Sequence, residues 1–132
     1  MKSKMIWANF SVKDTKRTRQ FYTQLGFIPN KPPGKDSKLA SFLFGESDFV
    51  IHFFEQGSQI DEYLTSGSKN NSEIIFTLSA ETEAEVSEFA DKVKEAGGNI
   101  LQQVRRDENG YYGFVFADPD GHKFNVLLMD NM

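Results

Sequence analysis

Residues 8–27, ANFSVKDTKRTRQFYTQLGF, combine a strand pattern with a helix pattern. The stretch MIWANFSV (5–12) alternates between two sets of side chains, which is the period-2 pattern of a strand. Asp14 then stands where a helix N-cap is expected, and apolar or small side chains recur at helical spacing up to Gly26: Thr18, Phe21, Tyr22 and Leu25. We therefore predict a strand followed by an amphipathic helix.

The rest of the first half continues this unit. The stretch PNKPPGKDSK (29–38) has three prolines and a glycine and is typical of a loop. Two strands are then expected in LASFLFGESDFVIHFFE (39–55), separated by a turn over Gly45–Asp48. We assign a βαβββ order to this first module, about residues 4–55, in which the patterns locate two of the three strands that follow the helix.

The second half repeats the plan. A strand is expected over 72–80, and Thr82 with Glu85 forms a capping box. A helical apolar stripe of Val86, Phe89, Ala90 and Val93 runs up to Gly97-Gly98. Three further strand patterns follow in NILQQV, GYYGFVFAD and HKFNVLLM. The second module, about 72–130, therefore has the order βαβββ as well.

The two modules align with each other along most of their length. Trp7 falls on Ile75, Phe21 on Phe89, Phe44 on Phe116 and His52 on Asn125. Between them, about 56–71, Ile60, Tyr63 and Leu64 have helical spacing and predict a short linker helix. We expect one α+β domain over 1–132, because a module of about 60 residues rarely buries enough surface alone.

Composition excludes several functions. The chain has 15 basic and 19 acidic residues, a net charge of −4 and no cysteine. No polybasic run suggests nucleic acid or an anionic membrane, and no apolar run is long enough for a membrane span. We expect neither of these partners and predict a soluble, cytoplasmic protein. The 13 Phe, 4 Tyr and 1 Trp are many for a hydrophobic fraction of 39%, so aromatic rings either fill the core or line a cavity.

The stretch DPDG (118–121) has two readings. A calcium loop of the EF-hand type needs a third acidic or amide ligand and a later glutamate, which are lacking here. A hairpin turn suits every residue, since Pro119 and Gly121 favour a turn and Asp118 can accept hydrogen bonds from its backbone. We therefore predict a structural turn, with His122 at the rim of the sheet and one ring nitrogen in water.

The chain resembles the vicinal oxygen chelate superfamily, the glyoxalase, bleomycin-resistance and extradiol-dioxygenase group, and within it the small glyoxalase-like proteins. The resemblance lies in ANFSVKDTKRTRQFYTQLGF, VSEFADKVKEAGGNI and GFVFADPDGHKFNVLL. It implies two βαβββ modules whose curved mixed sheets surround a cavity, with helices outside. It also implies a homodimer.

In the metal-using relatives, the resemblance implies one metal ligand from the first and one from the last strand of each module. The corresponding positions here are Trp7, His52, Ile75 and Asn125. Only the imidazole of His52 is a good metal ligand, since indole and isoleucine donate no lone pair and an amide oxygen is weak. A catalytic metal is usually held by three protein ligands, so we expect no metal and no other cofactor.

The same region has a second interpretation as a binding pocket. Strand alternation places Trp7, Asn9, His52, Thr77, Asn125 and Leu127 on the concave side, and Tyr112 is a further candidate because it can lend a hydroxyl. An apolar wall with a few polar groups suits a small-molecule ligand. Two alternatives remain: Trp7 fills the core, or His52 is a buried histidine bonded to Asn125.

Our leading hypothesis is a metal-independent protein that binds a small molecule, such as an antibiotic, in an aromatic pocket. The alternative is a lyase or isomerase of the glyoxalase type that uses a divalent metal or His52 alone. A structural protein with a filled cavity is a third reading. We find no G-x-S-x-G nucleophile motif and no phosphate-binding loop. The sequence alone does not identify the physiological ligand or the dimer surface.

Overall fold

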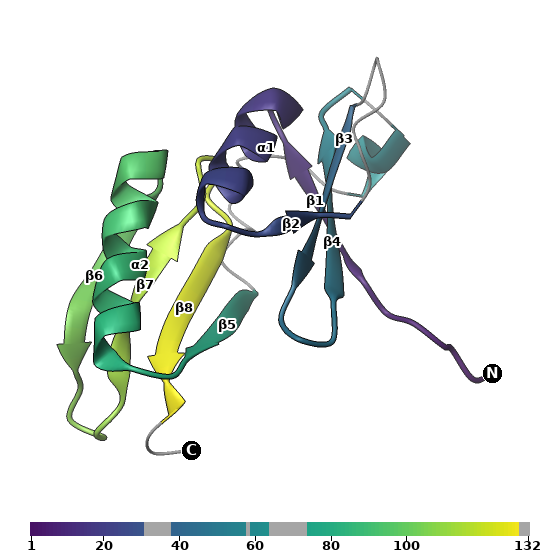
Figure 1. The fold of residues 1–132 in the computed structure, drawn as a ribbon. Coiled ribbons are helices and arrows are strands. Elements are labelled where there is room, and N and C mark those ends of the chain that lie inside the picture. Colours follow the sequence, from purple (N-terminus) through teal and green to yellow (C-terminus); the bar gives the residue numbers. More distant parts are fainter. Residues whose placement is uncertain (31–37, 58, 64–73, 130–132) are drawn as a thin grey trace. The chain divides into compact units, whose positions relative to one another are not determined.

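The chain forms two compact units, Met1–Ser68 and Lys69–Met132, each with its own sheet and helix (Figure 1). The computed structural model describes residues 1–30, 38–57, 59–63 and 74–129. Both units have the βαβββ order expected from the sequence. That they work as one domain stays a prediction.

Unit one consists of a four-stranded mixed sheet and one helix. Its elements are β1 (Ala8–Val12), α1 (Thr15–Gln24), β2 (Ile28–Pro29), β3 (Leu39–Phe44) and β4 (Phe49–Glu55). The strand order is β1-β4-β3-β2. The first strand runs parallel to β4, and the other neighbours are antiparallel.

Unit two has the same topology. Its elements are β5 (Ile75–Ala80), α2 (Glu83–Ala96), β6 (Asn99–Arg106), β7 (Tyr112–Ala117) and β8 (Lys123–Leu128). The order β5-β8-β7-β6 places the parallel pair β5 and β8 at the same position as β1 and β4. The prediction of an α+β fold with two similar modules is confirmed.

Both helices begin where capping chemistry predicts. Asp14 caps α1, because its side chain accepts hydrogen bonds from the backbone N–H groups of Lys16 and Arg17. Thr82 caps α2 by accepting from Glu85 N at 3.0 Å. The reciprocal bond of the capping box is shifted by one residue, since Glu85 Oε1 accepts from Glu81 N rather than from the cap itself.

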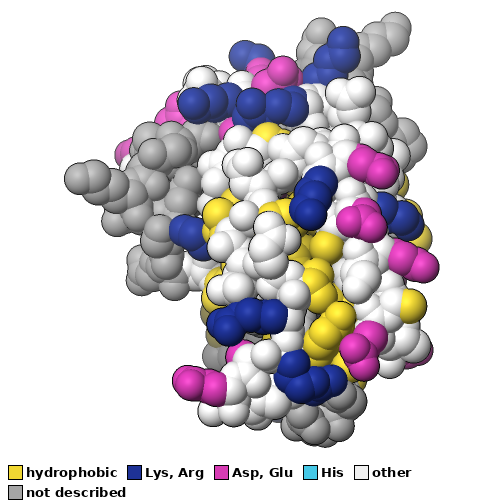
Figure 2. All heavy atoms as spheres, turned by 90° about the vertical axis from the view of Figure 1, so that its left-hand side faces the viewer, with side chains coloured by type: hydrophobic (Ala, Val, Ile, Leu, Met, Phe, Trp, Pro, Cys, Tyr) yellow, Lys and Arg dark blue, Asp and Glu magenta, His cyan; other side chains and the backbone are white. Residues whose placement is uncertain are grey.

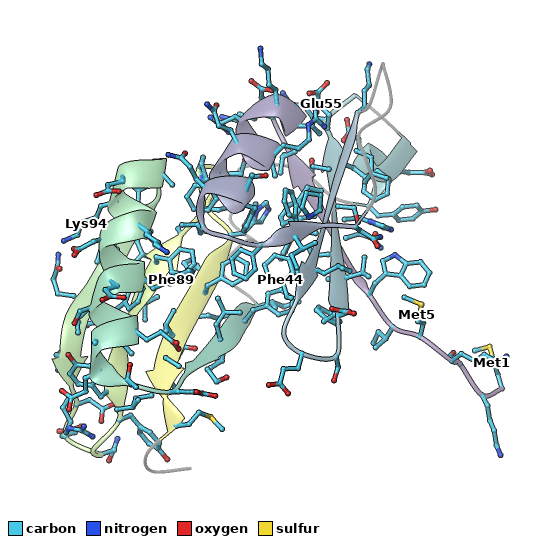
Figure 3. All side chains as sticks on the ribbon, in the orientation of Figure 1. Met1, Met5, Phe44, Glu55, Phe89 and Lys94 are labelled. Atoms are coloured by element: carbon cyan, nitrogen blue, oxygen red, sulfur yellow. The ribbon has the colours of Figure 1, made fainter. Side chains whose placement is uncertain are left out.

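Each helix covers one face of its sheet through aromatic rings. In unit one, the Tyr22 ring stacks on Phe53 with centroids 4.7 Å apart. In unit two, Phe89 lies 5.9 Å from Phe116, which stacks on Phe124 at 5.3 Å. Figure 3 shows Phe89 pointing from α2 toward the sheet and Lys94 pointing away from it. The predicted stripe of α1 is confirmed, because all four of its members are buried: Thr18, Phe21, Tyr22 and Leu25.

Several element boundaries differ from the sequence prediction, and the clearest differences are in the first module and the linker. The first strand begins at Ala8 rather than at residue 5. The loop predicted for 29–38 starts one residue too early, because Pro29 belongs to β2 and pairs with Phe42 of β3. Of the linker helix predicted for 56–71, the described part contains one 3₁₀ helix, η1 (Gln59–Glu62), while residues 58 and 64–71 lie outside the described residues.

The internal alignment of the modules holds at the parallel strands and fails at the hairpins. Asn9 pairs with His52 and Thr77 pairs with Asn125, so His52 and Asn125 are equivalent. However, Phe116 lies opposite the residue just before Asn125, and the residue opposite Ile51 in unit one is Phe42. Phe116 therefore corresponds to Phe42, not to Phe44, because the hairpin turns of the two modules differ in length.

Candidate functional site

The sheet of unit one presents a second face, opposite to α1, that carries both polar and aromatic side chains. Paired residues of neighbouring strands point to the same side, so Asn9, His52 and Ser41 share this face. The alternate residues, Ile51 and Phe53, are buried on the helix side. We call the second face the histidine face and define it by Trp7, Asn9, Ser41, His52 and Phe54.

His52 is held by a hydrogen bond that the sequence analysis did not foresee. Its Nδ1 lies 2.8 Å from Ser41 Oγ, and Asn30 Nδ2 donates to the same oxygen at 3.2 Å. Ser41 pairs directly with His52 across the antiparallel strands β3 and β4. In the sequence, Ser41 is one small residue within an alternating strand, and only the strand register identifies it as the partner of His52.

Two aromatic rings flank the imidazole. The centroid of the Trp7 ring lies 6.1 Å from that of His52, and the Phe54 centroid lies 5.9 Å from it, both in edge-on geometry. Trp7 precedes β1 and its side chain is 46% exposed, so it does not fill the core of unit one. The sequence-predicted residues Trp7, Asn9 and His52 are therefore brought together within unit one.

Unit two has an equivalent face, opposite to α2, which we call the asparagine face: Ile75, Thr77, Val115, Asn125 and Leu127. Thr77 pairs with Asn125 across the parallel strands, and Val115 pairs with Asn125 on the other side. The Asn125 Oδ1 atom is buried and has no hydrogen-bond partner among the described residues. The predicted residues Thr77, Asn125 and Leu127 share this face. That the two faces line one pocket stays a prediction.

Tyr112 does not share the asparagine face. Along β7 it lies two residues before Phe114 and four before Phe116. The rings of these two phenylalanines contact Phe89 of α2. Its own ring lies under the guanidinium group of Arg106, at 5.4 Å. Residues separated by two along a strand point to the same side, so Tyr112 belongs to the helix side of the sheet.

The DPDG stretch forms the hairpin turn between β7 and β8. Asp118 Oδ1 accepts from Asp120 N at 3.0 Å and from His122 N at 2.8 Å, and Gly121 N donates to Asp118 O. His122 is only 3% exposed and its Nδ1 lies 2.8 Å from Asp118 Oδ2. The turn is confirmed, whereas the expected position of His122 at a wet rim is wrong, since the Asp118 carboxylate makes its burial tolerable.

The side chains of these faces do not fit a resident catalytic metal. Of the four positions that the resemblance implies, Trp7, His52, Ile75 and Asn125, only His52 offers a strong ligand atom. Within the described ranges, no group of three or more His, Cys, Asp or Glu side chains lies close enough to hold a metal ion. A three-ligand zinc or iron centre would need donors that these positions lack.

The surface also bears on possible partners. On the face drawn in Figure 2, Lys and Arg side chains are interspersed with Asp and Glu, and the coloured residues form no continuous basic patch. In the part of the chain that the structure describes, no helix is long and apolar enough to cross a membrane.

The two βαβββ units define a paired-module α+β protein in which each sheet has one face, opposite to its helix, that carries polar side chains. The family model of the glyoxalase/bleomycin resistance protein/dioxygenase superfamily matches residues 4–126. The chain belongs to this superfamily.

Solved structures of similar proteins support this assignment. A hypothetical protein from S. aureus is 30% identical, with a TM-score of 0.83, and the match covers 97% of this chain and 95% of that one. A glyoxalase-related enzyme from Fulvimarina pelagi is 20% identical, with a TM-score of 0.75, over 96% and 88% of the two chains. The fosfomycin resistance protein FosX from Listeria monocytogenes is 19% identical, with a TM-score of 0.72, over 100% and 95%. The last two share the fold.

Proposed function

We propose that this protein binds a planar small organic molecule on the histidine face and needs no resident metal to do so. The observation that carries the proposal is the imidazole of His52, held by Ser41 and flanked by the rings of Trp7 and Phe54. Small-molecule sites typically combine aromatic walls with a few oriented polar groups. The partly exposed indole of Trp7 offers a ring surface on which a planar molecule can stack.

The asparagine face of unit two, considered by itself, also carries an atom that a ligand can satisfy. A buried amide oxygen without a partner costs about 1–3 kcal/mol, and such a cost is usually explained by a ligand, an ion or a water. Asn125 Oδ1 is an atom of this kind among the described residues. An N–H or O–H group of a bound molecule would satisfy it.

Trp7 makes the proposal directly measurable, because it is the only tryptophan of the chain. The full chain, stripped of metals with a chelator, is titrated with a panel of planar aromatic compounds while Trp7 fluorescence is recorded. We expect saturable quenching at one ligand per chain. Calorimetry of the His52→Ala variant should show at least about a tenfold loss of affinity, the size of one charge-assisted hydrogen bond. The exposed Leu101→Ala variant on β6 serves as the control and should bind as the wild type does.

The same titration separates the alternative function, a metal-dependent lyase or isomerase of the glyoxalase type. Saturation by zinc, nickel or manganese at one ion per chain, with organic compounds binding only afterwards, would favour the enzyme. No response to either metals or organic compounds would favour a structural protein and overturn the proposal. The homodimer implied by the family is tested on the same sample by sedimentation velocity.

A further inference from the structure

The hydroxyl group of Ser41 is the centre of a three-residue hydrogen-bonded chain in unit one. Asn30 Nδ2 donates to Ser41 Oγ at 3.2 Å, and the same oxygen lies 2.8 Å from His52 Nδ1. The backbone fixes all three residues, because Ser41 pairs with His52 and Asn30 N donates to Ser41 O at 2.9 Å. Their mutual geometry is therefore set by the sheet.

Counting donors and acceptors decides where the protons lie. A serine hydroxyl has one hydrogen and two lone pairs, and the Nδ2 group of asparagine can only donate. Asn30 therefore occupies one lone pair of Ser41 Oγ. If His52 donated from Nδ1, it would occupy the second lone pair, and the Ser41 hydrogen would have no acceptor among the described residues. The arrangement that uses every group has Ser41 donating to His52 Nδ1.

This arrangement fixes the chemical character of the imidazole. A neutral histidine that accepts at Nδ1 carries its proton on Nε2. Toward any bound molecule, His52 is then an N–H donor and not a lone-pair donor. Such a group recognises an acceptor oxygen, a carboxylate more strongly than a neutral carbonyl, and it cannot ligate a metal without changing tautomer.

We propose that Ser41 and Asn30 are positioning residues that hold His52 as the Nε2–H tautomer, and that the histidine face binds planar aromatic molecules bearing a carboxylate or a similar acceptor oxygen. The part on the ligand class rests on the proposed function. The part on the tautomer stands on the hydrogen-bonded chain alone.

The tautomer is read directly by two-bond ¹H–¹⁵N correlation NMR of the ¹⁵N-labelled full chain in alkaline buffer. The chain has two histidines, and His122 is an internal reference. Its Nδ1 faces the Asp118 carboxylate, which can only accept, so His122 must be protonated on Nδ1. We expect opposite patterns for the two rings. An Nδ1–H pattern for His52 in the wild type would overturn the proposal.

A nearly isosteric substitution tests the cause. In Asn30→Asp, the donor to Ser41 is replaced by an acceptor, so Ser41 should donate to the new carboxylate and receive a hydrogen bond from His52 Nδ1. The His52 pattern should then change to Nδ1–H. Asn109→Asp adds the same charge at an exposed turn of unit two and should leave it unchanged. If Asn30→Asp does not fold, Ser41→Ala replaces it, and a mixture of both tautomers is expected. An unaltered Nε2–H pattern in a folded variant contradicts the role of these residues.

The ligand class is tested with two probes of equal shape and opposite charge, 2-naphthoate and 2-naphthylmethylammonium, by Trp7 fluorescence. We expect 2-naphthoate to bind about tenfold more tightly, since a hydrogen bond to an ionised acceptor is roughly twice as strong as one between neutral groups. Equal affinity, or a preference for the cation, overturns the ligand class while leaving the proposed function intact. If neither probe nor any planar compound binds, the proposed function fails, and the NMR result still decides the tautomer.

Discussion

His122 and Asp118 form a buried pair at the hairpin turn between β7 and β8, with 2.8 Å between His122 Nδ1 and Asp118 Oδ2. The same carboxylate accepts from two backbone N–H groups of the turn, at Asp120 and His122. One aspartate therefore closes the turn and satisfies a buried imidazole. This arrangement assigns Asp118 to stability.

We expect Asp118→Ala to lower the free energy of unfolding by about 2–3 kcal/mol, because three donors lose their acceptor and two of the groups involved are buried. Urea denaturation measures the loss. Asp107→Ala is the matched control, since Asp107 Oδ1 accepts from Asn109 N and Tyr111 N in a more exposed turn. Its cost should be about 1 kcal/mol. Equal losses for the two variants would show that burial of the pair is irrelevant.

Gly113 is required by close approach of two strands. A Cβ atom at this position would overlap the carbonyl oxygen of Val126 on the neighbouring strand β8. Backbone atoms cannot move aside cheaply, so Gly113→Ala should destabilise the protein by about 3 kcal/mol or more.

The control for Gly113 is Gly97, which ends α2 at φ +96 with open space around it. Gly97→Ala should cost only the left-handed strain of about 1–2 kcal/mol. Thermal unfolding of both variants followed by circular dichroism separates overlap from strain. A smaller loss for Gly113→Ala than for Gly97→Ala would contradict the overlap.

Asn125 tests whether the asparagine face is kept for binding. Replacing an unsatisfied buried amide by an apolar side chain of similar size removes a desolvation cost, so Asn125→Leu should raise the free energy of unfolding by about 1 kcal/mol. Asn30→Leu is the control, since Asn30 has a hydrogen-bond partner and its loss should destabilise. If both substitutions raise the free energy of unfolding, the missing partner of Asn125 is not the cause of the stabilisation.

A substitution of Tyr112 tests whether this residue lines the binding site, as the sequence predicted, or lies on the helix side of β7. Because its side chain lies on the helix side of β7, Tyr112→Phe should leave ligand affinity within about twofold of the wild type. Fluorescence titration with the probe that the wild type binds gives the comparison. A large loss of affinity would place the Tyr112 hydroxyl in the binding site after all.

Much of the fold could be predicted because its signals are local. Asp14, Thr82 and Gly97 mark helix ends by their own hydrogen bonds or backbone angles, and alternation within strands is read from neighbours. The position of β2 could not be predicted, because its two residues, Ile28 and Pro29, are too few to show the alternation of a strand. Its strand character comes from pairing with β3, which the sequence does not display.

The candidate site was less predictable, because its contacts join distant residues. Asn30, Ser41 and His52 meet through strand register, and nothing in their immediate neighbours distinguishes Ser41 from any other serine of a strand. The position of Tyr112, in contrast, was within reach. Counting back by two from Phe116 and Phe114 places it on the helix side.

The two units differ at one equivalent position, and this difference has a consequence for how such a chain can change. Ser41 lies opposite His52, whereas Val115 lies opposite Asn125 in the same register. In a tandem copy, the two halves can therefore carry different side chains on the same backbone positions. The joint substitution Val115→Ser with Asn125→His would place a second serine–histidine pair in unit two, at the register position that the first pair has in unit one.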